Sequence, residues 1–171
     1  MLIVFNTNYL NVAAAYMNIL VHLLKFVPIE KIISGRNRIF IFVYLKDLGE
    51  KTLERLTEWC IFRQAPGSGF MGRPNKPEDT CYSFWVGATL SLLDLLHMTD
   101  NDASRQFVLR TQDAVTGGLA KWVDSQPDPL HTYLGLSGLS LQGEQGLLPV
   151  DPGLNMSIRA KTWLKTIHSS W

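Results

Sequence analysis

Three side chains of types that commonly bind transition metals stand out in the sequence: Asp79, Cys81 and His131. Zn²⁺ accepts carboxylate, thiolate and imidazole ligands, and a catalytic zinc typically has three protein ligands and one exchangeable position. Each residue also has an ordinary structural interpretation. Asp79 fits an N-cap of a helix beginning at Thr80, Cys81 a small buried hydrophobe, and His131 a core histidine. From spacing alone, a metal site and a purely structural set both remain open.

Apolar spacing predicts the helices that would position these residues. A helical pattern begins at Gly49 and stops at the glycine- and proline-containing turn 65–69. A further helix is expected through residues 105–111, beginning upstream near Asp100 or Asp102. Three more segments are assigned by pattern: a helix over 10–27, a strand or buried helix over 39–45, and a helix over 155–169.

Part of the chain repeats. Residues 64–92 align with residues 112–141 at an offset of 48 to 49 positions, so that Asp79 matches Asp128. Such a period is typical of repeat architectures, whose units stack to bury a continuous core. The alignment puts His131 one position from the counterpart of Cys81. We therefore expect both residues in the first turn of equivalent inner helices, where neighbouring units would bring them together.

The segment around the first two candidate ligands, GRPNKPEDTCYSFW at residues 72–85, closely resembles the β subunits of protein prenyltransferases. Within that family it is most similar to protein geranylgeranyltransferase type I. The resemblance implies an all-α fold, a partial α-α toroid built of helical hairpins. It covers residues 48–171, as the C-terminal part of a family member. Residues 1–47 form an atypical N-terminal segment without a family match, so a truncated form without turnover of its own is expected.

The resemblance also implies roles for individual residues. Asp79, Cys81 and His131 would bind one zinc per β subunit, which holds the substrate's cysteine as a reactive thiolate. Lys121 stands where farnesyltransferase has an aspartate that helps hold magnesium, so no Mg²⁺ is expected. The residues implied for the isoprenoid diphosphate are Arg73, Lys76, Tyr82 and Lys121, and those for the isoprenoid and peptide pocket are Trp85 and Leu130.

The implied reaction transfers geranylgeranyl from its diphosphate to the cysteine of C-terminal CaaX proteins in which X is Leu, such as small GTPases. The family enzyme works as a heterodimer with an α subunit. One alternative is an inactive fragment that only binds the α subunit, and another is a β subunit of the farnesyl or Rab type. The Rab-type motif typically has Glu at the position of Asn75 and Trp at that of Phe84. A zinc-free toroid such as a terpene cyclase is disfavoured by the Asp-x-Cys and His residues.

Composition narrows the class of protein further. Hydrophobic residues make up 46% and charged residues 18% of the 171, which is typical of a globular chain. A net charge of +1 argues against a nucleic-acid partner, and two cysteines do not make a disulfide framework. Residues 9–27 are apolar but include His22 and Lys25, so a buried or interface helix is favoured over a membrane span. A cytoplasmic protein is expected.

Overall fold

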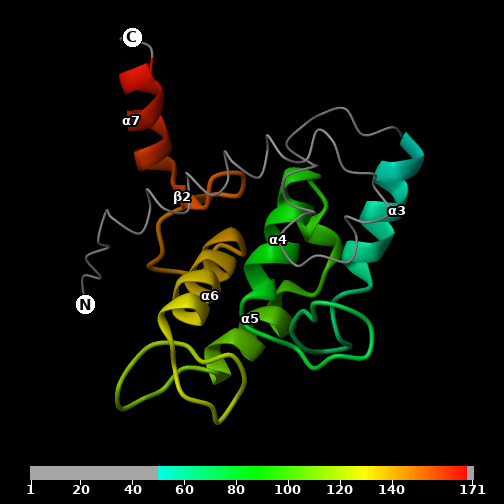
Figure 1. Ribbon diagram of the computed structural model, residues 1–171, viewed down its shortest axis with the longest axis vertical. Coiled ribbons are helices and arrows are strands. Elements are labelled where there is room, and N and C mark those ends of the chain that lie inside the picture. Colours follow the sequence, from blue (N-terminus) through cyan, green and yellow to red (C-terminus); the bar gives the residue numbers. More distant parts are fainter. Residues whose placement is uncertain (1–49, 169–171) are drawn as a thin grey trace, which may run out of the picture.

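The computed structural model describes residues 50–168 (Figure 1). The helix expected over 10–27, the apolar run 39–45 and the proposed boundary between residues 47 and 48 lie outside this range. Within 50–168, the structure contains no helix that is both long and apolar enough to cross a membrane.

The described part of the chain is mainly helical, as expected. A short two-stranded antiparallel sheet precedes the last helix. The elements in chain order are α3 (Glu50–Ile61), α4 (Tyr82–Leu92), the 3-10 helix η2 (Leu96–Met98), α5 (Asn101–Arg110), α6 (Pro129–Leu141), β1 (Val150–Asp151), β2 (Met156–Ser157) and α7 (Ile158–His168).

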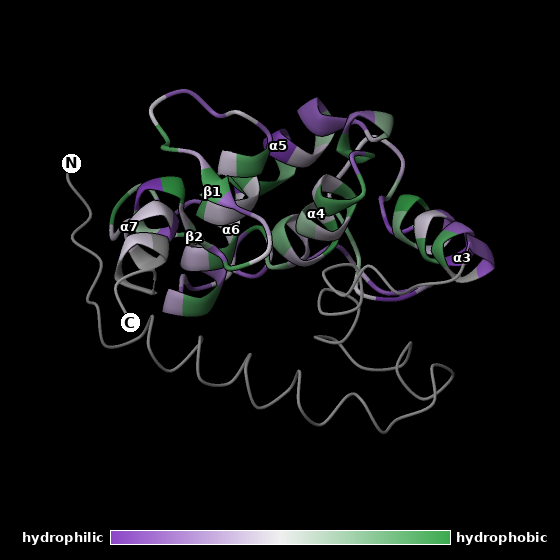
Figure 2. Ribbon diagram, turned by 90° about the horizontal axis from the view of Figure 1, so that it is seen from above, coloured by the Kyte–Doolittle hydropathy of each residue, from purple (hydrophilic) through white to green (hydrophobic). Residues whose placement is uncertain are grey.

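Helices α4 and α6 form the interior of the described region, side by side (Figure 1). Neither contains an Asp, Glu, Lys or Arg, and 8 of the 11 residues of α4 and 6 of the 13 residues of α6 are buried. A helix that is apolar around its whole circumference needs cover on every side. By contrast, α3 and α5 carry their charged residues on the outside and pack through one apolar face (Figure 2). Alternating outer and inner helices are what the hairpins of an α-α toroid require.

The two inner helices approach closely at Gly138. A Cβ atom built on this glycine would lie 2.2 Å from the Oγ atom of Ser83 and 2.8 Å from its backbone carbonyl carbon. Real Cβ atoms do not come this near to a backbone, so only glycine permits the observed separation of α4 and α6. The start of each helix is thereby held near the start of the other.

The repeat seen in the sequence is present in the backbone. In each unit, two isolated antiparallel bridges join the end of the outer helix, the loop and the residues before the inner helix. Asn75 and Asp124, which are 49 positions apart, both have a φ of 61°. The bridges of the first unit are Gln64 with Phe70 and Met71 with Glu78, and those of the second are Gln112 with Leu119 and Ala120 with Pro127.

The start of α5 is as expected, whereas the start of α7 is not. Asp100 is the N-cap of α5, and its side chain accepts a hydrogen bond from the backbone N–H of Ala103 at 2.9 Å. The helix predicted over 155–169 begins only at Ile158. Asn155 has a φ of 48° and its N–H donates to the backbone carbonyl of Asp151, which closes the β1–β2 hairpin. This turn was missed because its apolar spacing continues that of the helix.

Candidate metal centre

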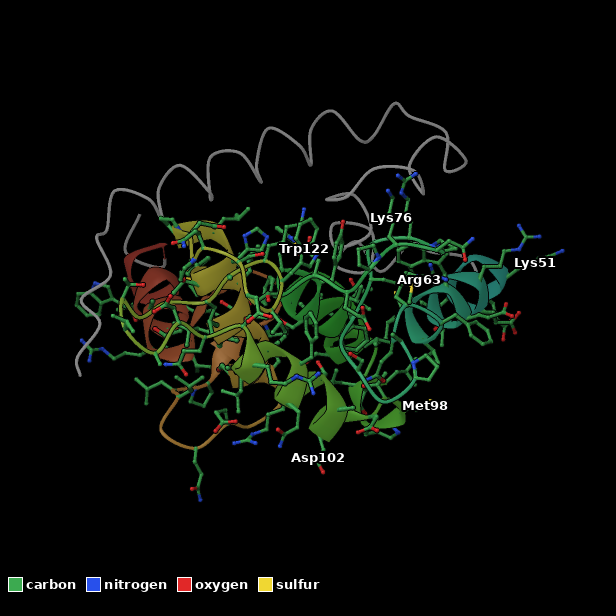
Figure 3. All side chains as sticks on the ribbon, turned by 90° about the horizontal axis from the view of Figure 1, so that it is seen from below. Lys51, Arg63, Lys76, Met98, Asp102 and Trp122 are labelled. Atoms are coloured by element: carbon green, nitrogen blue, oxygen red, sulfur yellow. The ribbon has the colours of Figure 1, made fainter. Side chains whose placement is uncertain are left out.

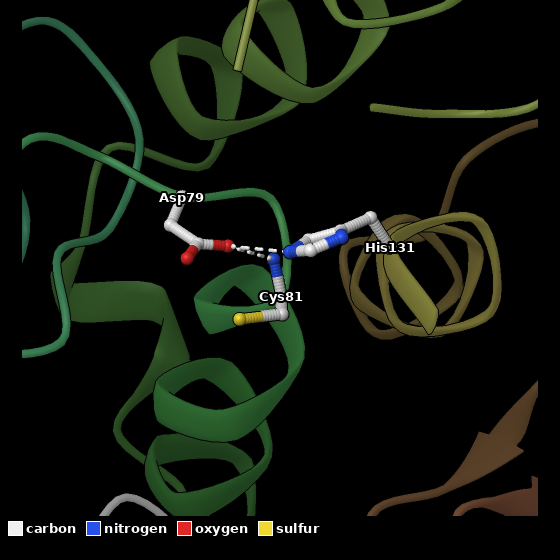
Figure 4. Close-up of side chains that lie close together, drawn as sticks. All are labelled: Asp79, Cys81 and His131. Atoms are coloured by element: carbon white, nitrogen blue, oxygen red, sulfur yellow. Dashed lines mark hydrogen bonds and ion pairs between the residues drawn. The ribbon is translucent and has the colours of Figure 1, made fainter. Parts of the chain in front are cut away.

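Asp79, Cys81 and His131 meet between the starts of the two inner helices (Figure 4). Asp79 lies just before α4, Cys81 is the N-cap residue of α4, and His131 lies in the first turn of α6. One potential ligand atom from each residue lies within 4.8 Å of the other two. All three residues are only 9% exposed. The structure therefore places two residues of the first unit and one of the second at a single buried point.

The first turn of α4 orients Asp79 and Cys81. The Oδ1 atom of Asp79 accepts a hydrogen bond from the backbone N–H of Cys81 at 3.0 Å. The expected N-cap role of Asp79 for a helix beginning at Thr80 is wrong in detail, because the regular helix begins at Tyr82. Asp79 nevertheless binds a free N–H group at the helix start. The same Oδ1 lies 3.3 Å from Nε2 of His131, so local capping and metal binding do not exclude one another.

His131 is held by a second aspartate, Asp128, the N-cap of α6. One carboxylate oxygen of Asp128 accepts from the backbone N–H of His131 at 3.0 Å. The other lies 2.6 Å from the ring Nδ1. The imidazole is thus fixed at Nδ1, and its Nε2 points toward Asp79.

The donor set fits a zinc ion. Two ligands bound to one tetrahedral zinc at about 2.0–2.2 Å lie roughly 3.4 Å apart. The 3.3 Å between Asp79 Oδ1 and His131 Nε2 agrees with that separation. Burial, followed by the hydrogen bond and the negative charge of Asp79, raises the pKa of the Cys81 thiol well above its ordinary value. A thiolate here therefore needs a nearby cation, which a bound divalent metal would supply.

Lys121 lies beside this cluster. Its Nζ atom is 3.6 Å from Oδ2 of Asp79 and 4.5 Å from the centroid of the Trp122 ring. Thr80 holds the Lys121 backbone in place, because its N–H donates to the Lys121 carbonyl at 3.1 Å and its hydroxyl lies 3.2 Å from the same oxygen. The loop of the second unit thus brings a cation to the edge of the site. Its contact with a diphosphate stays a prediction.

Of the other three residues expected at the diphosphate, one side chain is buried and two are exposed. Tyr82 is 9% exposed and packs against Gly72, where an added Cβ would lie 2.1 Å from the Tyr82 hydroxyl oxygen. Arg73 and Lys76 are exposed on the loop before Asp79, and Figure 3 shows Lys76 projecting away from the helices. Their exposure is compatible both with binding an anion and with a solvated loop, so their role also stays a prediction.

Trp85 and Leu130, the expected pocket residues, have different surroundings. Trp85 lies one turn from Cys81 and donates its backbone N–H to the Cys81 carbonyl at 3.1 Å. It packs partly buried against the core, with its ring edge-on to Phe84. Leu130 is 57% exposed, next to His131. Contact of Trp85 or Leu130 with an isoprenoid or a peptide stays a prediction.

One residue of the site was missed in the sequence. Asp128 was recognised only as the repeat counterpart of Asp79, not as a partner of His131. A usable signal existed, since an Asp followed by Pro at the first helical position and His two residues later places the His in reach of an N-cap side chain. A rule for capping would therefore have found it.

Comparison with known proteins agrees with this geometry. The prenyltransferase α-α toroid domain model matches residues 23–156. That range begins inside the segment 1–47, for which no family motif was found.

Among curated proteins, the chain is 44% identical over 105 residues to the geranylgeranyl transferase type-1 subunit beta of Arabidopsis thaliana, covering 61% of this chain and 28% of that protein. It is 39% identical over 123 residues to the Dictyostelium discoideum type-1 subunit beta, covering 71% and 34% respectively. A type-2 subunit beta from Saccharomyces cerevisiae is 37% identical over 105 residues, with 61% and 32% covered. The chain thus spans about a third or less of the length of these relatives.

A solved structure, Candida albicans protein geranylgeranyltransferase-I complexed with GGPP, is similar at a TM-score of 0.68 and 29% identity. The similarity covers 75% of this chain and 42% of that chain. The repeated backbone and the two apolar inner helices agree with the family match over residues 23–156. This chain belongs to the prenyltransferase α-α toroid family.

Proposed function

We propose that this chain carries the zinc site of a protein geranylgeranyltransferase type I β subunit. The observation that supports this most directly is the buried convergence of Asp79, Cys81 and His131 within a chain of the prenyltransferase family. These three ligands would leave a fourth position on the metal free for exchange, as catalytic zinc sites do. A bound zinc would hold the sulfur of a substrate cysteine as a thiolate near neutral pH.

The chain's own residues would prepare this reaction in two ways. Asp79 and His131 are already oriented by hydrogen bonds at the helix starts, so little reorganisation accompanies metal binding. Lys121, 3.6 Å from Asp79, would stabilise negative charge on the departing diphosphate, together with Tyr82, Arg73 and Lys76. Trp85 and Leu130 would contact the isoprenoid and the substrate peptide. The partner would be a prenyltransferase α subunit, and the substrates geranylgeranyl diphosphate and CaaX proteins ending in Leu.

A β subunit of another prenyltransferase type is the second candidate. The type-2 relative from yeast and a farnesyltransferase subunit beta of Pisum sativum, 44% identical over 55 residues, favour keeping it. The charge at position 121 distinguishes the two, since Lys121 can replace a magnesium ion at the diphosphate whereas an acid would bind one.

A chimera tests the proposal without depending on the rest of this chain. Residues 50–168 would replace the matching segment of the Arabidopsis type-1 subunit beta, co-expressed with its α subunit. We expect zinc-dependent transfer of labelled geranylgeranyl to a peptide ending in Leu, and little farnesyl transfer to a peptide ending in Met. A chimera that prefers the farnesyl donor and the Met peptide would contradict the type I assignment.

A further inference from the structure

The backbone of Lys121 is anchored more firmly than its side chain. The N–H of Thr80 donates to the Lys121 carbonyl at 3.1 Å, which fixes the main chain beside the start of α4. The Lys121 side chain is 40% exposed, and a flexible four-carbon stem separates its ammonium group from that anchor. A lysine loses rotamer freedom when its charge is held at one point, so contacts of the ammonium group determine where the charge lies.

Two contacts hold this ammonium group. Its Nζ atom lies 3.6 Å from Oδ2 of Asp79 and 4.5 Å from the centroid of the Trp122 ring. The first contact depends on the negative charge of Asp79, which a metal bound at that carboxylate would share. The second depends on the π face of the ring, which attracts a cation without a carboxylate. The ring is therefore the contact that would keep the ammonium group in place when the metal site is occupied.

The repeat shows how the second unit differs at this point. At an offset of 49 positions, Lys121 matches Gly72 and Trp122 matches Arg73. An added Cβ at Gly72 would lie 2.1 Å from the Tyr82 hydroxyl oxygen, so the first unit has no room for a side chain there. In the second unit that position carries the cation, and an aromatic ring replaces the arginine that follows. The lysine and the ring beside it thus belong to the second unit alone.

We propose that Trp122 is a positioning residue that holds the ammonium group of Lys121 ready for the negative charge of the departing diphosphate. This rests on the role of Lys121 in the proposed function. The Trp122 ring is 42% exposed (Figure 3), so filling the core does not explain it. A cation that is already in place stabilises developing charge without reorganisation when the bond breaks. Trp122 would thus act on the reaction rate through Lys121, without touching a substrate.

Proton NMR of the 171-residue chain tests the contact itself. Methylene protons above an aromatic ring are shifted upfield by its ring current. We expect this shift for the ε-methylene protons of Lys121, both with and without zinc. Trp122→Leu should abolish the shift and Trp122→Phe should keep part of it. Trp163→Leu is the matched control, because it removes a tryptophan of α7 that is 67% exposed, and it should leave the shift unchanged. A wild-type chain without the shift in the presence of zinc would overturn the inference.

A double-mutant cycle in the chimera tests what the contact does. We expect Trp122→Leu to lower the single-turnover rate at saturating donor about 2- to 5-fold, which corresponds to a cation–π contact at an exposed site, with Trp122→Phe in between. In a Lys121→Ala background, Trp122→Leu should lower the rate no further, because the two residues act as one unit. The affinity for the peptide ending in Leu should be the same in all variants.

Three results would contradict the inference, each for a different reason. An unchanged rate in Trp122→Leu would mean that the ring does not position the lysine. An equal loss of rate with and without Lys121, or a weaker affinity for the peptide, would mean that Trp122 contacts a substrate directly. A wild-type rate in Lys121→Ala would instead contradict the diphosphate role of Lys121 in the proposed function, and the inference would fall with it even if the NMR shift is present.

Discussion

The two repeat units, residues 64–92 and 112–141, have similar backbones, but the aspartate before the inner helix has a different role in each. In each, an aspartate before the inner helix accepts a hydrogen bond from a backbone N–H of the first turn. The side chain of Asp79 is 12% exposed and faces the cluster, whereas that of Asp128 is 41% exposed and holds a ring that faces it. The aspartate at the equivalent position is thus a candidate ligand in the first unit. In the second unit it instead holds the ring of the candidate ligand His131.

The difference arises from one position in the sequence. Cys81 follows its aspartate by two residues and His131 follows its own by three. The bonded N–H of the second unit therefore belongs to the histidine itself, and the remaining carboxylate oxygen reaches its ring. The repeat brings the two helix starts together. The shift by one residue explains why Asp128 contacts a histidine ring whereas Asp79 faces the cluster.

Removing the thiol of the first unit should have the largest effect. We expect Cys81→Ala to lower bound zinc from about one equivalent per chain to near zero, because three ligands are the minimum of such a site. Metal analysis of the purified chain measures this. Cys60→Ala is the control, since Cys60 is fully buried in the core and burial raises its pKa to about 12. Equal zinc in wild type and Cys81→Ala would remove Cys81 from the site.

Separating the two units should be the next largest change. Gly138→Ala places a methyl group against the Ser83 backbone and should destabilise the chain by about 1–3 kcal/mol, with weaker zinc binding because α4 and α6 move apart. Gly87→Ala, in the middle of α4, meets only two leucine methyl groups at 3.9 Å and should stabilise by about 0.5–1 kcal/mol. Denaturant unfolding of both variants gives the values. Stabilisation by Gly138→Ala as well as by Gly87→Ala would show that the close helix contact at Gly138 is unimportant.

Changing the cation that the second unit supplies should alter the metal requirement of the reaction. In the chimera, Lys121→Asp should make single-turnover rates depend on Mg²⁺, because a carboxylate would replace an ammonium group at the proposed diphosphate site. Lys121→Ala removes the charge without offering a ligand and should be slow with or without Mg²⁺. If Lys121→Asp responds to the ion no more than Lys121→Ala does, Lys121 is not a diphosphate residue.

The smallest effect concerns an ion pair between the two segments that flank the second unit, Arg105 before it and Glu144 after it. Arg105 of α5 donates to Glu144, whose counterpart in the first unit is Leu95. The hydrogen bond from Arg105 lowers the pKa of Glu144, so its contribution is complete near neutral pH and is lost as pH falls through the lowered pKa. Because the pair is accessible to solvent, Arg105→Ala should lower the melting temperature by at most about 2 °C at pH 7. Glu144→Gln should match it, and a larger fall for Arg105→Ala alone would indicate lost packing.

Much of the fold could be predicted from local signals. The first helix after Gly49, the start of α5 at Asp100 and the paired loops follow from apolar spacing, capping residues and the 48- to 49-residue period. The start of α7 could not, because the turn at Asn155 depends on contacts with Asp151 in a hairpin without a strong strand pattern. The candidate site was predicted as three residue types, and the structure brings those three together.

Two similar units, with Cys81 and His131 near the starts of equivalent helices, could be recognised in the sequence, because repetition and capping are local in origin. The meeting of the two helix starts depends on the fold, because residues 50 positions apart come together through the packing of α4 on α6 at Gly138. The neighbour of each ring nitrogen of His131 likewise follows from the fold, since it depends on side-chain positions that no spacing specifies.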